Sequence, residues 1–315
     1  MPIAALLSRA TESVAEKTGD TVGGLLNATL GNLTELVIAA AALRAGEYAL
    51  VKGSIAGAIV TNTLFMLGAS FLIGGLTHHI QEYNRATARL DAALLFLATI
   101  ALVSPSAIAK ADLVPATALT QKLSIALAVL LIVGYGLGLL FSLKTHREIF
   151  ASAEHAEPSE PAWPIGLALV TLAIVTVLVA LVSEIFVESV QKAAETFGMS
   201  QAFVGFIVVA LAGGTAEMAV AFSAARKDRL DLSVGIALGS ASQIALFVGP
   251  VLGADGPAIL ARRDTLVAAF ITSGGRSAWF VGALLLLVYA VFAITLYLWH
   301  QWRDLVTARP PLSRG

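Results

Sequence analysis

Long stretches without charged residues recur along the chain and predict membrane-spanning helices. Six of them contain no Asp, Glu, Lys or Arg: residues 53–81, 92–109, 123–143, 161–183, 232–254 and 277–302. Two others, residues 21–43 and 196–225, contain one charge each, Glu35 and Glu217. Each stretch is near or above the roughly 18–20 residues that cross a bilayer as a helix. The pattern therefore predicts eight spans.

The pattern is weaker at two places. Residues 3–17 read as the end of a helix, and neither a basic start nor a cleavage site of a signal peptide is present. We expect the first helix to be truncated, with the natural start upstream. Residues 265–275 are apolar but too short to cross alone, and we expect them to be re-entrant or partial.

Composition supports a membrane protein and excludes several other classes. Hydrophobic residues make up 57% of the 315 positions and charged residues only 13%, whereas soluble domains carry about 25% charged residues. The net charge of −1 argues against a nucleic-acid partner. The absence of cysteine excludes disulfides and thiolate metal sites.

A charged, proline-containing segment divides the chain into two halves of similar size. We expect residues 147–162 to form a short acidic linker between a first half, residues 1–146, and a second half, residues 163–302. Residues 303–315 would be a C-terminal tail. The Lys and Arg residues of the loops weakly favour the linker's side of the membrane as cytoplasmic.

The two halves contain copies of one segment. When the sequence is shifted by 182 residues, 12 of 43 positions are identical between residues 23–65 and 205–247, and Glu35 coincides with Glu217. The repeats extend over about 23–68 and 205–253. An odd number of predicted spans separates the copies, so they cross the membrane in opposite directions. Inverted repeats are a design of secondary transporters.

These patterns together predict the fold class. We expect an all-α integral membrane protein with about 8–10 transmembrane helices in two inverted repeats.

The two intramembrane glutamates are the main candidates for chemistry. A carboxylate inside a membrane is costly unless it is paired, protonated or bound to a metal. Two carboxylates meeting at the axis between the repeats would form a cation site. Oxygen ligands favour hard cations such as Ca²⁺, and also Na⁺. Because either carboxylate can instead bind a proton, Glu35 and Glu217 would also couple transport to protons.

Polar residues near the glutamates supply further oxygen atoms. The predicted metal ligands are Glu35, Glu217, Asn32, Asn62, Ser240, Ser242 and Gln243. Asn62 and Gln243 could alternatively make only interhelical hydrogen bonds, and the two serines could serve as small packing residues. Asn27 is another possible donor. We also expect Gly57 and Gly239 to loosen their helices and to free backbone carbonyls.

The motifs resemble a known family. Residues 23–36, with the sequence GGLLNATLGNLTEL, are similar to the first alpha repeat of calcium/proton antiporters of the cation/calcium exchanger superfamily. Residues 213–217 and 238–248 are similar to its second alpha repeat. The resemblance implies a ten-helix core with inverted five-helix halves, Ca²⁺ near the two glutamates, and an acidic cytoplasmic segment between the halves.

The second repeat departs from the family at the residue after its glutamate. The family usually has Asn-Ala-Ala-Glu-His there, whereas this chain has residues 214–218 with the sequence GTAEM. Met218 therefore replaces the histidine that the family associates with proton coupling. Because methionine cannot carry a proton, the proton would bind to Glu35 or Glu217 themselves.

The resulting hypothesis is a secondary active transporter that exchanges Ca²⁺ for H⁺ by alternating access. The alternatives are a Na⁺-coupled or monovalent cation/proton exchanger and a degenerate, non-transporting homologue. An enzyme is not indicated, because the spans contain no recognisable nucleophile or metal motif. We expect no cofactor, a lipid bilayer as surroundings, and the cytoplasmic (inner) membrane of a prokaryote as the location. The sequence leaves the oligomeric state open.

Overall fold

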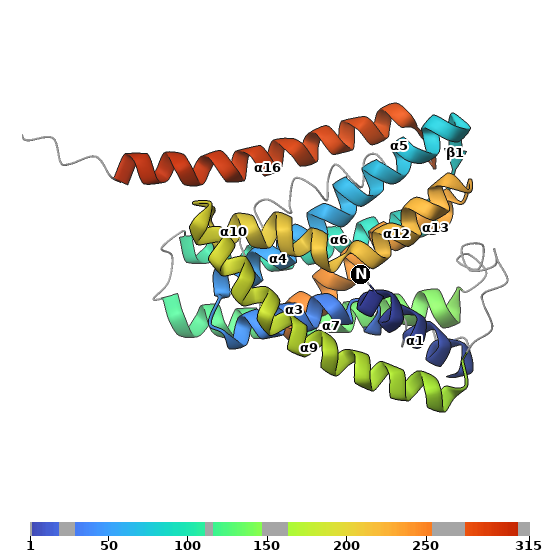
Figure 1. Ribbon diagram of the computed structural model, residues 1–315, viewed down its shortest axis with the longest axis horizontal. Coiled ribbons are helices and arrows are strands. Elements are labelled where there is room, and N and C mark those ends of the chain that lie inside the picture. Colours follow the sequence, from blue (N-terminus) through green and yellow to red (C-terminus); the bar gives the residue numbers. More distant parts are fainter. Residues whose placement is uncertain (1, 19–28, 111–115, 147–162, 254–274, 308–315) are drawn as a thin grey trace, which may run out of the picture.

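Figure 1 shows the computed structural model, which describes residues 2–18, 29–110, 116–146, 163–253 and 275–307. Helices dominate these residues, and two strands of three residues join them. In the first half the elements are α1 (Pro2–Thr18), α3 (Leu33–Arg44), α4 (Tyr48–Val60), the π-helix η1 (Thr61–Met66), α5 (Leu67–His78), β1 (Ile80–Glu82), α6 (Arg85–Lys110), α7 (Ala116–Leu140) and the π-helix η2 (Phe141–Thr145).

The second half follows a similar order. Its elements are α9 (Ile165–Thr196), α10 (Gln201–Val204), the π-helix η4 (Gly205–Val209), α11 (Ala210–Gly213), α12 (Thr215–Arg226), α13 (Leu230–Gln243), the π-helix η5 (Ile244–Val248), α14 (Gly249–Val251), β2 (Arg276–Ala278) and α16 (Trp279–Thr307). The helix α16 thus continues five residues into the predicted C-terminal tail.

The predicted helical membrane architecture is confirmed. Among the described residues, five helices are long and apolar enough to span a membrane: Tyr48–His78, Lys122–Thr145, Ile165–Thr196, Leu230–Val251 and Trp279–Leu298. The pair Gln201–Gly213 and Thr215–Arg226 is a sixth if the two helices form one span, bent by 60°.

Four predicted segments are described only in part or fall within longer elements or outside the described residues. The predicted span 92–109 lies within the 26-residue helix α6, whereas the span 21–43 is described only from residue 29. The linker 147–162 and most of the short apolar stretch 265–275 lie outside the described residues.

The outer helices expose apolar side chains. Leu167 and Val177 of α9 are more than half exposed, and so is Leu287 of α16. In Figure 1, α9 and α16 lie on opposite outer faces of the bundle, with α3, α4 and α12 between them. An apolar outer surface around a core of helices is the arrangement that a lipid environment favours.

The structure reproduces the internal repeat at the level of helix ends. Adding 182 to the bounds of α3 gives 215 and 226, which are the bounds of α12. The same shift takes the first residue of α4 to the first residue of α13. The π-helices η1 and η5 also correspond within one residue. The register predicted from the sequence is therefore confirmed.

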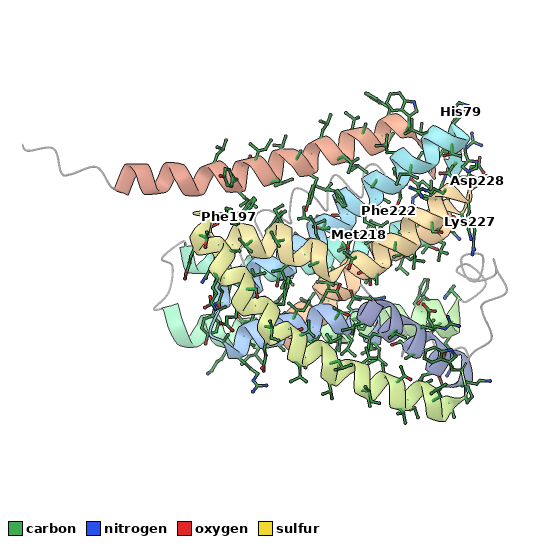
Figure 2. All side chains as sticks on the ribbon, in the orientation of Figure 1. His79, Phe197, Met218, Phe222, Lys227 and Asp228 are labelled. Atoms are coloured by element: carbon green, nitrogen blue, oxygen red, sulfur yellow. The ribbon has the colours of Figure 1, made fainter. Side chains whose placement is uncertain are left out.

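The two copies run in opposite directions. A short turn joins the end of α3 to Tyr48, which begins the 31-residue helical span that ends at His78. The end of α12 lies at the other end of that span, because His78 Nε2 is hydrogen bonded to Arg226 O at 2.9 Å. Figure 2 shows His79, Lys227 and Asp228 together at this end of the molecule. The helices α3 and α12 thus end on opposite sides, as the inverted repeat requires.

Contacts between the loops close the end of the bundle that contains His78. The strands β1 and β2 pair antiparallel there, with Gln81 opposite Ser277. The buried side chain of Gln81 donates hydrogen bonds to Ala225 O at 3.1 Å and to Asp228 Oδ1 at 2.7 Å. We call this region, residues 78–84, 225–231 and 275–278, the closed end. It joins loops from both halves.

Glycines let the two repeats approach each other closely. A Cβ atom on Gly57 would lie 2.2 Å from Phe206 O, and one on Gly205 would lie 2.5 Å from Leu50 O. Small residues therefore permit close contact between helices of the two repeats.

The predicted loosening at Gly57 and Gly239 is wrong. The helices α4 and α13 continue regularly through both residues, and the π-helices begin later, at Thr61 and Ile244. Gly57 serves contact between helices, because a backbone from the other repeat occupies the space of its missing side chain.

These two glycines give a matched test of the close contact. Gly57→Ala places a methyl group against Phe206 and should lower the free energy of unfolding by about 1–3 kcal/mol. From the described residues, no atom lies within 4 Å of the Cβ position of its repeat counterpart Gly239, so Gly239→Ala should leave stability unchanged or slightly raised. The check is the thermal midpoint of the detergent-solubilised protein. Equal midpoints for the two variants would contradict the packing described here.

Candidate functional site

Each intramembrane glutamate lies in the first turn of a helix that follows a break. Glu35 is the third residue of α3, which begins after a turn at Gly31 and Asn32. Glu217 is the third residue of α12, which begins after the 60° bend at Gly214. The first N–H groups of a helix lack intrahelical partners and carry partial positive charge. Both carboxylates are therefore placed where a helix end favours negative charge.

The two breaks bring the glutamates to one place between the repeats. Glu35 Oε1 lies 3.2 Å from the Cβ position of Gly213, which is one turn before Glu217. The Glu217 carboxyl group lies close enough to Glu35 and to Ser240 for both to influence its charge. Glu35 therefore lies beside the segment that leads into Glu217.

Four of the other predicted ligands form one hydrogen-bonded network across the repeats. Asn32 Nδ2 donates to Gln243 Oε1 at 2.5 Å, and Asn32 Oδ1 accepts from Ser240 Oγ at 2.9 Å. Asn62 Nδ2 donates to Ser240 Oγ at 2.9 Å. We call Asn32, Asn62, Ser240 and Gln243 the amide network. Its members come from both repeats, so the network holds the two halves in a fixed relation beside the glutamates.

The structure does not bring Ser242 into the amide network. Ser242 Oγ donates to Gly239 O of its own helix at 2.9 Å. Thr61, another oxygen donor next to the site, is hydrogen bonded to Tyr289 instead. Asn27 lies outside the described residues.

One oxygen atom of the site lacks a partner. Glu217 Oε2 is buried, and no hydrogen-bond donor reaches it from the described parts of the chain. A buried carboxylate oxygen without a donor is costly unless a proton or a cation occupies the place of the donor. A proton or a cation bound at this oxygen would supply the missing partner.

The chemistry of the donors suits a hard cation. Across the described residues, no three His, Asp or Glu side chains cluster as a typical transition-metal site would require. The donors that do meet are two carboxylates, with amide and hydroxyl oxygens beside them. Such oxygen ligands favour Ca²⁺ or Na⁺ over transition metals.

A small pocket borders Glu35. Its walls come from α3, α4, η5 and the segment η4–α11, and Ser54, Ala58, Gly213 and Val248 are among the lining residues. The lining residues lie between the glutamates and the end of the bundle that contains Tyr48. The pocket therefore lies on the side opposite to the closed end.

Asp91 is a further helical carboxylate that the sequence analysis did not single out. It is the seventh residue of α6 and lies among the buried residues Ala88, Ala92 and Leu95. The charge-free stretch begins at residue 92, directly after Asp91. The helix α6 begins earlier, at Arg85. Asp91 lies three residues after Ala88 and four residues before Leu95, and this helical spacing could have indicated that it shares a helix face with them.

The fold and the site together define the class of protein. Inverted repeats, a broken helix and two carboxylates meeting between the repeats are features of a secondary transporter for cations. The chain belongs to the sodium/calcium exchanger protein family, whose model matches residues 1–144 and 167–298.

Individual relatives cover nearly the whole chain. The chain is 37% identical to the Ca²⁺/H⁺ antiporter of Aphanothece halophytica, over 94% of this chain and 87% of the relative. It is also 37% identical to the Ca²⁺/H⁺ antiporter ChaA of Bacillus subtilis (strain 168), over 94% and 89%. The solved structure of native YfkE matches with a TM-score of 0.77 and 34% identity, over 94% of this chain and 88% of that one.

The two serines of α13 test the amide network. Ser240→Ala removes both a donor to Asn32 and an acceptor for Asn62, and should lower the free energy of unfolding by about 1–3 kcal/mol. Ser242→Ala removes a hydroxyl that, among the described residues, is hydrogen bonded within its own helix, and should have a smaller effect. Thermal midpoints of the purified variants check this. A drop as large for Ser242→Ala as for Ser240→Ala would contradict the network.

Proposed function

We propose that this protein is an antiporter that exchanges Ca²⁺ for H⁺ by alternating access at the site of Glu35 and Glu217. The observation that carries the proposal is the proximity of two carboxyl groups at helix breaks, with Glu217 Oε2 lacking a donor in the described part of the chain. The names of the relatives support the choice of ions, because two of them are Ca²⁺/H⁺ antiporters. We further propose the cytoplasmic membrane of a prokaryote as its location.

Charge balance explains why exchange would be obligatory. Two ionised carboxylates carry two negative charges, which one Ca²⁺ or two protons neutralise. An empty site with both carboxylates ionised would be costly in a membrane interior. The repeats would therefore change from one orientation to the other only when the site holds Ca²⁺ or protons. This argument favours two protons for each Ca²⁺.

The amide network would hold the ligands in place. Ser240 is hydrogen bonded to Asn32 and Asn62, and lies beside Glu217. A cation that binds between the glutamates would take oxygen atoms from these side chains as its remaining ligands. We propose Asn32, Asn62, Ser240 and Gln243 as this set. Ser242 would contribute only after its bond to Gly239 O is broken.

The two ends of the bundle support alternating access. The pocket borders Glu35 on the side of Tyr48, whereas strand pairing and the bonds of Gln81 join both halves at the closed end. The structure would then represent a state open to one side of the membrane. The loops at the closed end carry Arg226, Lys227 and Arg229, so the positive-inside rule favours the cytoplasm for that end.

Transport in proteoliposomes tests the proposal. An imposed proton gradient should drive Ca²⁺ uptake by the wild type, and Glu35→Gln or Glu217→Gln should abolish it, because one negative charge cannot balance Ca²⁺. Glu188→Gln is the matched control, since this exposed carboxylate of α9 pairs only with Lys192 in the described part of the chain. It should transport like the wild type.

The outcomes separate the alternatives. Uptake that requires a Na⁺ gradient would replace the proposal with Na⁺-coupled exchange. No flux of either kind from folded wild-type protein would indicate a non-transporting homologue. Normal uptake by either glutamine variant would contradict the two-carboxylate site.

A further inference from the structure

Two phenylalanines occupy the same place in the two repeats, and each contacts a buried tyrosine. Phe65 of η1 and Phe247 of η5 coincide under the shift of 182 residues. The ring centroids of Phe65 and Tyr289 are 5.3 Å apart, and those of Phe247 and Tyr135 are 5.7 Å apart. The sequence gives no direct sign of this arrangement, because the tyrosines themselves do not coincide under the shift.

The contacts join opposite halves of the chain. Tyr289 lies on α16, in the second half, and contacts the first repeat. Tyr135 lies on α7, in the first half, and contacts the second repeat. Both tyrosines are buried, with 7% and 8% of their surface exposed. The pairing is therefore a second expression of the inverted repeat, outside the site already described.

Each tyrosine hydroxyl is hydrogen bonded to a threonine that lies close in sequence to an asparagine of the amide network. Tyr289 Oη and Thr61 Oγ1 are hydrogen bonded at 3.3 Å, and Thr61 directly precedes Asn62. Tyr135 is hydrogen bonded to Thr29, which lies three residues before Asn32. Each tyrosine thus makes two contacts: its ring packs on a π-helix, and its hydroxyl is hydrogen bonded close in sequence to an asparagine of the amide network.

The backbone at these points needs such support. A π-helix has poorer hydrogen-bond geometry than an α-helix and occurs mostly as single turns at functional sites. Asn62 lies within η1, and Gln243 directly precedes η5. The orientation of both amide side chains therefore depends on π-helical segments, whose backbone hydrogen bonds stabilise them less than those of an α-helix would.

We propose that Tyr135 and Tyr289 are positioning residues of the ion site, a role that rests on the proposed function. Each anchors the π-helix of the opposite half through its ring, and one side of the amide network through its hydroxyl. They do not contact the ion. Their loss should therefore weaken ion binding while the transport step remains.

Removal of the hydroxyl alone gives the sharpest test. Tyr289→Phe and Tyr135→Phe should each raise the Ca²⁺ concentration for half-maximal binding by about 2- to 10-fold, the effect of one net hydrogen bond on an equilibrium constant. The maximal rate of uptake per folded protein should change little. Calorimetric titration of the purified protein with Ca²⁺, together with uptake in proteoliposomes, provides both readouts.

Tyr297→Phe is the matched control on the same helix. Its ring packs edge-on against Phe203, and 37% of its surface is exposed, so the variant should bind Ca²⁺ like the wild type. Thr61→Val removes the partner of Tyr289. The double variant Tyr289→Phe/Thr61→Val should bind no more weakly than the weaker single variant, because both changes remove the same bond.

The outcomes are distinct from those that test the function. Wild-type protein that neither binds nor transports Ca²⁺ would overturn the proposed function, and the positioning role with it. If the wild type binds and transports, an unchanged half-saturation in both phenylalanine variants would overturn the positioning role alone. The same result with a lower yield of folded protein would also overturn it, because the tyrosines would then serve stability only. An equal shift in Tyr297→Phe would overturn it as well.

Discussion

Two carboxyl groups that share one buried place between the repeats constrain the rest of this structure. Neither Glu35 nor Glu217 forms an ion pair within the described residues. Each instead lies in the first turn of a helix, and the neutral amide network lies beside them. Such a place is stable only when a positive species completes it. The helix breaks, the amide network and the close packing at Gly57 and Gly205 all serve to form it.

The residue that follows Glu217 determines how a proton can take part. Met218 is buried, and its terminal methyl group lies 3.3 Å from the Cβ position of Gly214, beside the break. Figure 2 shows it in the middle of the bundle, below Phe222 and far from the charged closed end. A side chain that cannot titrate fills the place next to the second carboxylate. Protons would therefore bind to the carboxylates that also bind the cation.

The sequence predicted the features that depend on local pattern. Charge-free stretches located the helices, and the shift of 182 residues predicted which helix ends correspond and which two acids meet. The bend at Gly214, the π-helices at Thr61 and Ile244 and the ring contacts of Tyr135 depend on packing between distant helices. No spacing along the chain indicates them. For Ser242 the sequence alone was misleading: its hydroxyl oxygen is a suitable ligand type, but the hydroxyl donates a hydrogen bond within its own helix.

The central claim is that Ca²⁺ and protons compete for the same two carboxylates. Initial rates of Ca²⁺ uptake in proteoliposomes, measured against Ca²⁺ concentration at several pH values, test it most directly. Because a protonated carboxylate must lose its proton before it can bind Ca²⁺, the half-saturating concentration should rise steadily as pH falls, while the maximal rate changes little. A constant half-saturation with a maximal rate that falls with pH would contradict the account and would place the proton path elsewhere.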